Sequence, residues 1–317
     1  AITAGGAVTD SGTQEITGAT TISASGQAIT LNTATNNFAA AVGITGANVA
    51  VTDEDAIDLG ASTVSGTYGI TATAGDITDS GVLAITGATT LTAASGQSIT
   101  LDSASTYSST VAFSSGGTLA NVTIDDSTVL DLAALTLSGN LSVTSGGNIT
   151  DSGVLNITGT SSFTTDVSNS TITLNNTNIL IGTVSLNTTG ASANATIDNG
   201  TTGLVFTTST IGGNLTATSG DSITDSGVIT VGGTASFTTD TTDKLITLNS
   251  ENAITGQVTF DTTSTGGDVI FNNGTTAISL GTIASGDIGG DLTLLTDADQ
   301  TISNAITLGG SGAELSI

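Results

Sequence analysis

The chain has 317 residues, a mass of 30.5 kDa and a formal net charge of −26, because it carries 27 acidic residues and one basic residue, Lys244. So few cations exclude a nucleic-acid surface and anchoring to an anionic membrane, because both need several Lys or Arg side chains. The sequence also lacks a run of about 20 apolar residues that would span a bilayer. We therefore expect no nucleic-acid partner and no membrane insertion.

A short motif, Thr-Asp-Ser-Gly, recurs along the chain. Its aspartates are Asp10, Asp79, Asp151 and Asp225, at spacings of 69, 72 and 74 residues. Apolar columns keep step with it, and one of them contains Ile16, Ile85, Ile157 and Val231. We therefore predict one continuous repeat region, 1–317, with approximate modules at 1–69, 70–138, 139–212 and 213–289 and a partial module at 290–317.

Short segments within each module alternate apolar and polar residues. In the 139–212 module they are 141–143, 172–174 and 184–186, separated by Gly, Asn, Asp and Ser clusters. A period of two predicts strands with one buried face, and the intervening clusters are typical of turns. Helical spacing of apolar residues is absent, so we predict an all-β chain.

Short strands in units of about 20–30 residues favour a β-solenoid, a parallel β-helix in which each unit forms one coil. The sequence predicts about 13 coils of 20–32 residues, three per module of about 69–77 residues, with right-handed coiling. A row of β-sandwich domains is the alternative, because about 70–100 residues suit one sandwich. The shorter sub-repeat and the frequent turns favour the solenoid.

The repeated motif has the chemistry of a solenoid corner. Asp can accept a hydrogen bond from the backbone N–H two residues on, and Gly tolerates positive φ. Three coils separate consecutive copies, about 14 Å, so the aspartates cannot share one ion. We therefore predict structural corners at Asp10, Gly12, Asp79, Gly81, Asp151, Gly153, Asp225 and Gly227.

Two acidic clusters offer oxygen ligands for calcium, the one cofactor that the residues suggest. They are Asp53 and Asp55 in "TDEDAID", and Asp297 and Asp299 in "TDADQ". The alternative is that these are solvated turn residues, since neither an EF-hand loop nor a repeated calcium nonapeptide is present. We expect no other metal and no other cofactor.

The residues argue against catalysis and against ice binding. The chain has no His or Cys to act as general base or nucleophile. Adjacent carboxylates such as Asp125 and Asp126 point to opposite faces of a strand. Ice binding requires Thr-x-Thr in register on every coil, and "TAT" at Thr71 and Thr216 reads as isolated. We therefore predict a protein that is not an enzyme.

The stretches "GGNLTATSGDSITDSGVITVGGTASFTT" and "GGNITDSGVLNITGTSSFTT" resemble the repeats of filamentous-haemagglutinin-type exoproteins. They are also similar to repeats of large bacterial surface proteins and autotransporter passengers. The resemblance covers essentially the whole chain. It implies a secreted right-handed β-helix that serves as a stalk or adhesive fibre, and it transfers no binding residues.

Two functions remain open at this point. The first is an acidic, extracellular structural shaft of a cell-surface fibre or giant adhesin, in which the partner is a further copy or a continuation of the chain, joined end to end as a filament. The absence of Met predicts an excerpt of a longer chain or a filament subunit. The second is an adhesin passenger that binds a glycan or a cell surface. The low aromatic content, 3%, favours the shaft.

Overall fold

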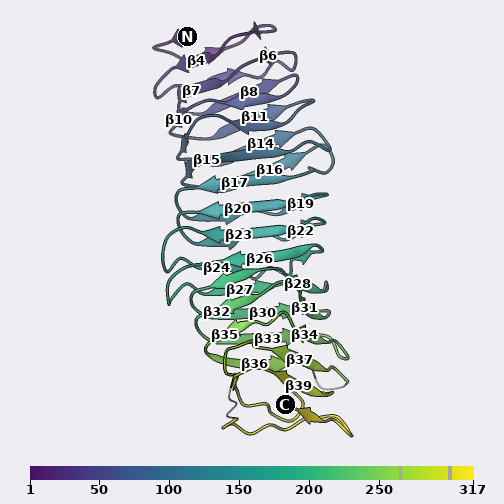
Figure 1. Ribbon diagram of the computed structural model, residues 1–317. Coiled ribbons are helices and arrows are strands. Elements are labelled where there is room, and N and C mark those ends of the chain that lie inside the picture. Colours follow the sequence, from purple (N-terminus) through teal and green to yellow (C-terminus); the bar gives the residue numbers. More distant parts are fainter. Residues whose placement is uncertain (264–265, 299–301) are drawn as a thin grey trace. The chain divides into compact units, whose positions relative to one another are not determined.

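The computed structural model describes residues 1–263, 266–298 and 302–317. All regular structure in these residues is β, and none of them forms a helix that is long and apolar enough to cross a membrane. The chain divides into two compact units, Ala1–Gly153 and Val154–Ile317. Each unit is a stack of short strands (Figure 1).

In the Ala1–Gly153 unit the strands form two main parallel sheets, A and B. Sheet A of this unit contains β1 (Ile2–Thr3), β4 (Thr20–Ser23), β7 (Val42–Gly46), β9 (Ile57–Leu59), β10 (Ser62–Val64), β12 (Ile77–Asp79), β13 (Leu83–Ile85), β15 (Ile99–Tyr107), β17 (Val122–Asp126) and β20 (Leu141–Ser145). Sheet B contains β2 (Val8–Thr9), β5 (Ile29–Leu31), β8 (Val49–Asp53), β11 (Tyr68–Ala72), β14 (Thr89–Ala93), β16 (Val111–Ser115), β18 (Leu130–Leu132) and β21 (Ile149–Asp151). The remaining strands are β3 (Glu15–Ile16), β6 (Asn37–Phe38) and β19 (Leu135–Leu137).

The Val154–Ile317 unit is built in the same way. Its sheet A contains β23 (Ser161–Thr165), β26 (Thr183–Asn187), β28 (Leu204–Phe206), β29 (Ser209–Ile211), β31 (Ile223–Asp225), β32 (Ile229–Val231), β34 (Ile246–Leu248), β35 (Ala253–Ile254), β37 (Val269–Asn272), β39 (Leu292–Leu295) and β40 (Leu315–Ser316). Its sheet B contains β24 (Ile172–Leu174), β27 (Ala195–Asp198), β30 (Leu215–Ser219), β33 (Ala235–Thr239), β36 (Gln257–Asp261) and β38 (Ser279–Leu280). A separate pair is formed by β22 (Leu155–Ile157) and β25 (Ile179–Leu180).

Each strand pairs in parallel with the strand one coil later, as Ile2 does with Ile22 and Tyr68 does with Thr89. The coils contain about 21 residues, and the chain makes about 15 turns. The predicted all-β parallel solenoid is therefore confirmed. The coil length lies at the short end of the predicted 20–32 residues, and the number of turns is therefore somewhat larger than the predicted 13.

The module is not a whole number of coils. Each passage of the chain across a sheet is a half-coil, which is either one unbroken strand or two short strands separated by a corner. From the corner at Asp79 to the corner at Asp151 the chain makes seven half-coils: β12 with β13, β14, β15, β16, β17, β18 with β19, and β20. The predicted three coils per module are therefore corrected to three and a half. As a result, Asp79 ends a strand of sheet A, whereas Asp151 ends a strand of sheet B.

Inward-facing residues form a close-packed core in each unit. The predicted apolar column is buried at Ile85, Ile157 and Val231. In the Val154–Ile317 unit the phenylalanines stack from coil to coil. The ring centroid of Phe237 lies 6.4 Å from that of Phe206 and 6.0 Å from that of Phe260. Such contacts add to the stabilisation from area burial, because offset and edge-to-face ring pairs are favourable.

Phe237→Ala should therefore lower the free energy of unfolding by about 3–5 kcal/mol, since it leaves a cavity between two rings. The control is Ser236→Ala on the opposite face of the same strand, which should change the free energy by no more than about 0.5 kcal/mol. Urea unfolding followed by circular dichroism measures both. Equal effects of the two substitutions would contradict the assignment of Phe237 to the core.

Candidate functional site

The Thr-Asp-Ser-Gly motif forms the corners at which a half-coil bends. Asp79 is the last residue of β12, and β13 begins four residues later; β31 and β32 flank the equivalent corner at Asp225. Asp10 follows β2, and Asp151 is the last residue of β21. The motif therefore stands between the two short strands of a broken half-coil.

The corner carboxylates accept hydrogen bonds from the following coil. The Asp225 Oδ1 atom accepts from the backbone N of Asn249 at 2.8 Å, and Oδ2 accepts from the Asn252 Nδ2 atom at 2.7 Å. The Asp10 Oδ2 atom accepts from the backbone N of Thr33 at 3.0 Å and from the Asn36 Nδ2 atom at 2.7 Å. The predicted partner was a backbone N–H two residues on. The bonds run instead to the next coil, because the corner of that coil presents its free N–H groups to the carboxylate.

The hydrogen bonds from the next coil also affect the pKa of the Asp10 carboxyl group. Burial alone would raise the pKa of its carboxyl group, but hydrogen bonds from Asn36 and Thr33 stabilise the charged form. The pKa of Asp10 is therefore lowered. A carboxylate that binds backbone donors in this way joins one coil to the next.

The corner glycines are required for space. None of Gly12, Gly81, Gly153 and Gly227 has a positive φ, which corrects the predicted reason for glycine at these positions. A Cβ atom at Gly81 would lie 2.2 Å from the backbone N of Ala61, and one at Gly227 would lie 2.5 Å from the N of Thr208. Gly153 is similarly crowded, whereas Gly12 has open space around its Cβ position. Close stacking of coils, rather than backbone conformation, selects glycine at the three crowded corners.

Buried asparagines complete the corners, and the sequence reasoning missed them. The Asn252 side chain donates to Asp225, and its Oδ1 atom accepts from the backbone N of Ile229 at 2.7 Å. Asn36 does the same between Asp10 and the backbone N of Gln14. The signal was available, because an asparagine follows the corner aspartate by 26 or 27 residues at Asn36, Asn178 and Asn252. At the corner of Asp79 this position is Ser105.

The calcium candidates Asp53 and Asp55 lie beside each other in one turn but differ in burial. Asp53 is fully buried, and its carboxylate accepts hydrogen bonds from the backbone N atoms of Phe38 at 3.1 Å and Asp55 at 3.3 Å. Asp55 and Asp297 are exposed, and Asp299 lies outside the described residues. Within 1–263, 266–298 and 302–317, acidic side chains form no group of three that could hold a metal ion.

Single outward Thr residues lie in register on adjacent coils, but the Thr-x-Thr pairs that begin at Thr71 and Thr216 are not repeated on every coil, since Thr218 pairs with Asp198. Thr71 pairs with Thr52 and Thr92 on adjacent coils, and Thr92 hydrogen-bonds Ser114 at 2.7 Å. Thr216 lies between Thr196 and Ser236 in the other unit. The hydroxyl rows continue for several coils because these paired strands keep their register.

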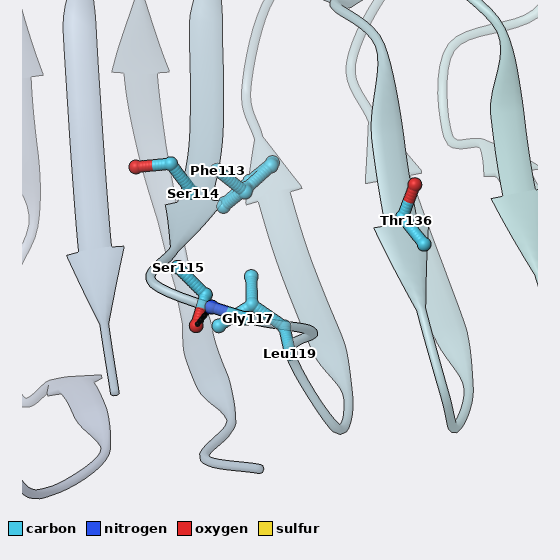
Figure 2. Close-up of a pocket in the computed structure, with 6 residues that line it drawn as sticks. All are labelled: Phe113, Ser114, Ser115, Gly117, Leu119 and Thr136. Atoms are coloured by element: carbon cyan, nitrogen blue, oxygen red, sulfur yellow. Dashed lines mark hydrogen bonds between the residues drawn. The ribbon is translucent and has the colours of Figure 1, made fainter. Parts of the chain in front are cut away.

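A hollow of about 200 Å³ opens in the Ala1–Gly153 unit where an unbroken half-coil is followed by a broken one. Only Val111 of β16 pairs with β18, and β19 bridges to Leu119 beyond the end of β16 instead of to β16 itself, so the end of β16 has no paired strand in the next coil. Figure 2 shows the lining residues, which are Phe113, Ser114, Ser115, Gly117, Leu119 and Thr136. The hollow has hydroxyl groups and apolar surface but no ionisable side chain.

The single basic residue is also engaged. The Lys244 Nζ atom lies 3.0 Å from the Asp221 Oδ1 atom, and both side chains are partly exposed. This ion pair lowers the pKa of Asp221. Lys244 therefore bridges two neighbouring coils, and among the described residues it has no second cation beside it.

Asn252→Ala should lower the free energy of unfolding by about 1–3 kcal/mol, because it leaves buried partners at Asp225 and Ile229 without their hydrogen bonds. Asn249→Ala is the matched control, since that side chain is exposed and only its backbone N binds Asp225. Thermal or urea unfolding measures the difference. If both variants match the wild type, the asparagine does not hold the corner.

Comparison with known proteins assigns the chain to a repeat family. It matches the family described as "Repeats of unknown function (DUF5649)" over residues 1–45, 46–114, 119–187 and 192–261. The three longer matches, 46–114, 119–187 and 192–261, each hold seven half-coils, and they begin about one coil before the modules predicted from the sequence. No curated protein and no solved structure matches the chain. Because the four matches cover most of its length, the chain belongs to this family of repeats.

Proposed function

We propose that the chain is a structural segment, part of the shaft of an extracellular surface fibre or giant adhesin. The observation that supports this proposal is that the repeated polar residues form hydrogen bonds between coils. At the corners of Asp10 and Asp225, the carboxylate and its asparagine hydrogen-bond each other across neighbouring coils. Such residues hold a repeat together, and this favours a mechanical role over catalysis.

The extracellular setting is part of the same proposal. A net charge of −26 with one basic residue suits a chain that remains dispersed among like copies, because equal charges repel. The chain has no Cys, so its stability depends on backbone pairing and packing rather than on disulfides. The resemblance to exoprotein repeats supports secretion.

End-to-end association is the partner interaction that we propose. Every coil presents the same parallel pattern of N–H and C=O groups to the next, so a coil from another copy offers a matching edge. The exposed faces are acidic and hydroxylated, which disfavours sideways contacts between copies. A filament that grows along the stacking direction satisfies both conditions.

Glycan binding is the second candidate, and the hollow beside β16 supports it. An uncharged hollow of about 200 Å³ that is lined by Phe113 and by the hydroxyl-bearing Ser114, Ser115 and Thr136 suits a neutral sugar ring. On this alternative the chain is an adhesin passenger that contacts a cell-surface glycan.

Electron microscopy of the purified chain at increasing concentration separates the two candidates. The shaft proposal predicts unbranched particles that lengthen at constant width, together with no selective signal on a glycan array. Particles that keep one length at all concentrations, combined with saturable binding to one class of neutral glycan, would contradict it. Phe113→Ala is the control for the array, because it should abolish any binding at the hollow.

A further inference from the structure

The corner at Asp79 differs from the corners at Asp10 and Asp225 in the residue that the next coil places against the carboxylate. Both of those aspartates receive a side-chain amide from the next coil, Asn36 or Asn252. The equivalent residue for Asp79 is Ser105, which is fully buried. The Ser105 Oγ atom accepts from the backbone N of Leu83 at 3.0 Å, as the asparagine Oδ1 atoms do at their corners. The shorter side chain therefore keeps the acceptor role of asparagine but lacks its amide donor.

The missing donor leaves one carboxylate oxygen of Asp79 unpaired. Its Oδ1 atom accepts from the backbone N of Asp102 at 3.0 Å and of Ser103 at 3.4 Å. Its Oδ2 atom is buried and has no hydrogen-bond partner. A buried charged oxygen without a donor is costly, whereas a protonated carboxyl group carries no charge to desolvate.

The two tyrosines of the chain occupy this region. Tyr68 and Tyr107 are each 1% exposed, and neither hydroxyl group has a hydrogen-bond partner. Tyr68 lies on β11 and Tyr107 lies at the end of β15, and both interact electrostatically with the Asp79 carboxylate. Burial raises the pKa of both phenols, so they stay neutral.

The other groups around Asp79 are acidic. Asp102 on β15 and Asp58 on β9, the adjacent strand of the previous coil, both carry carboxylates, and Asp126 on β17 faces Tyr107. The described residues place no Lys or Arg here, since Lys244 pairs with Asp221 in the other unit. None of these neighbouring groups would stabilise a negative charge on the Asp79 carboxyl group. Burial raises the pKa of Asp79 to about 6, with repulsion from Asp102 adding to the effect.

We propose that the corner between β12 and β13 is a proton-operated switch, in which uptake of a proton by Asp79 closes a buried Asp–Tyr–Tyr cluster and release of that proton loosens it. The folded chain binds this proton more tightly than the unfolded chain does. Stability therefore rises as the pH falls from about 6 toward 3.8, the ordinary pKa of aspartate, and is lost as the pH rises through about 6. Acidification of the medium would tighten this corner.

Tyrosine fluorescence of the full chain tests the switch directly, because the chain has two tyrosines and no tryptophan. An ionised carboxylate near a phenol quenches its emission. The wild type should therefore gain emission on acidification, with a midpoint near pH 6. Asp79→Asn should remove this transition, and Asp225→Asn, the matched corner in the other unit, should retain it.

A second variant keeps the test informative if Asp79→Asn fails to fold. Ser105→Asn restores the amide donor, so it should shift the midpoint downward by at least one pH unit. Emission of the wild type that is flat between pH 4 and pH 8 overturns the proposal. A transition that persists in folded Asp79→Asn, or a midpoint that is unchanged in folded Ser105→Asn, overturns it as well.

Discussion

The structure depends on the parallel pairing of each coil with the next. Backbone pairing joins the strands, but a broken half-coil leaves N–H groups unpaired at its corner, and buried unpaired donors are costly. The corner aspartate satisfies them from the previous coil, as Asp225 does for Asn249 and Ser250. A partner asparagine, Asn252 in this case, then bonds back to the carboxylate. The repeated motif is therefore a connection between coils.

The half-coil is the unit from which the module is built, and this has a geometric consequence. Seven half-coils are an odd number, so consecutive Thr-Asp-Ser-Gly corners alternate between the two sheets, as Asp79 and Asp151 do. Both sheets of the unit therefore contain Thr-Asp-Ser-Gly corners. This distribution suits a shaft whose sides are alike, and it disfavours a single specialised face.

Alternation of apolar and polar residues predicted the strands, the parallel solenoid and core residues such as Ile85 and Ile157, because burial of one strand face depends on local pattern. The same pattern could not predict the number of coils or the sheet in which each corner lies, since both depend on the register between residues about 21 apart. The partners of the corner aspartates were missed for the same reason. The asparagine at 26 or 27 residues was visible in the sequence, but its meaning required the stacking geometry. The Ser105 substitution stands out only after Asn36 and Asn252 have been seen to bind their aspartates.

Hydrogen–deuterium exchange of Asp225→Ala tests most directly whether the corner carboxylate holds the following coil. The backbone N–H groups of Asn249 and Ser250 should exchange faster in the variant, because their acceptor has been removed. The N–H groups of β33, which pairs with β30 and β36 in the other sheet, should exchange at the wild-type rate. Unchanged protection at Asn249 and Ser250 in the folded variant would contradict the account.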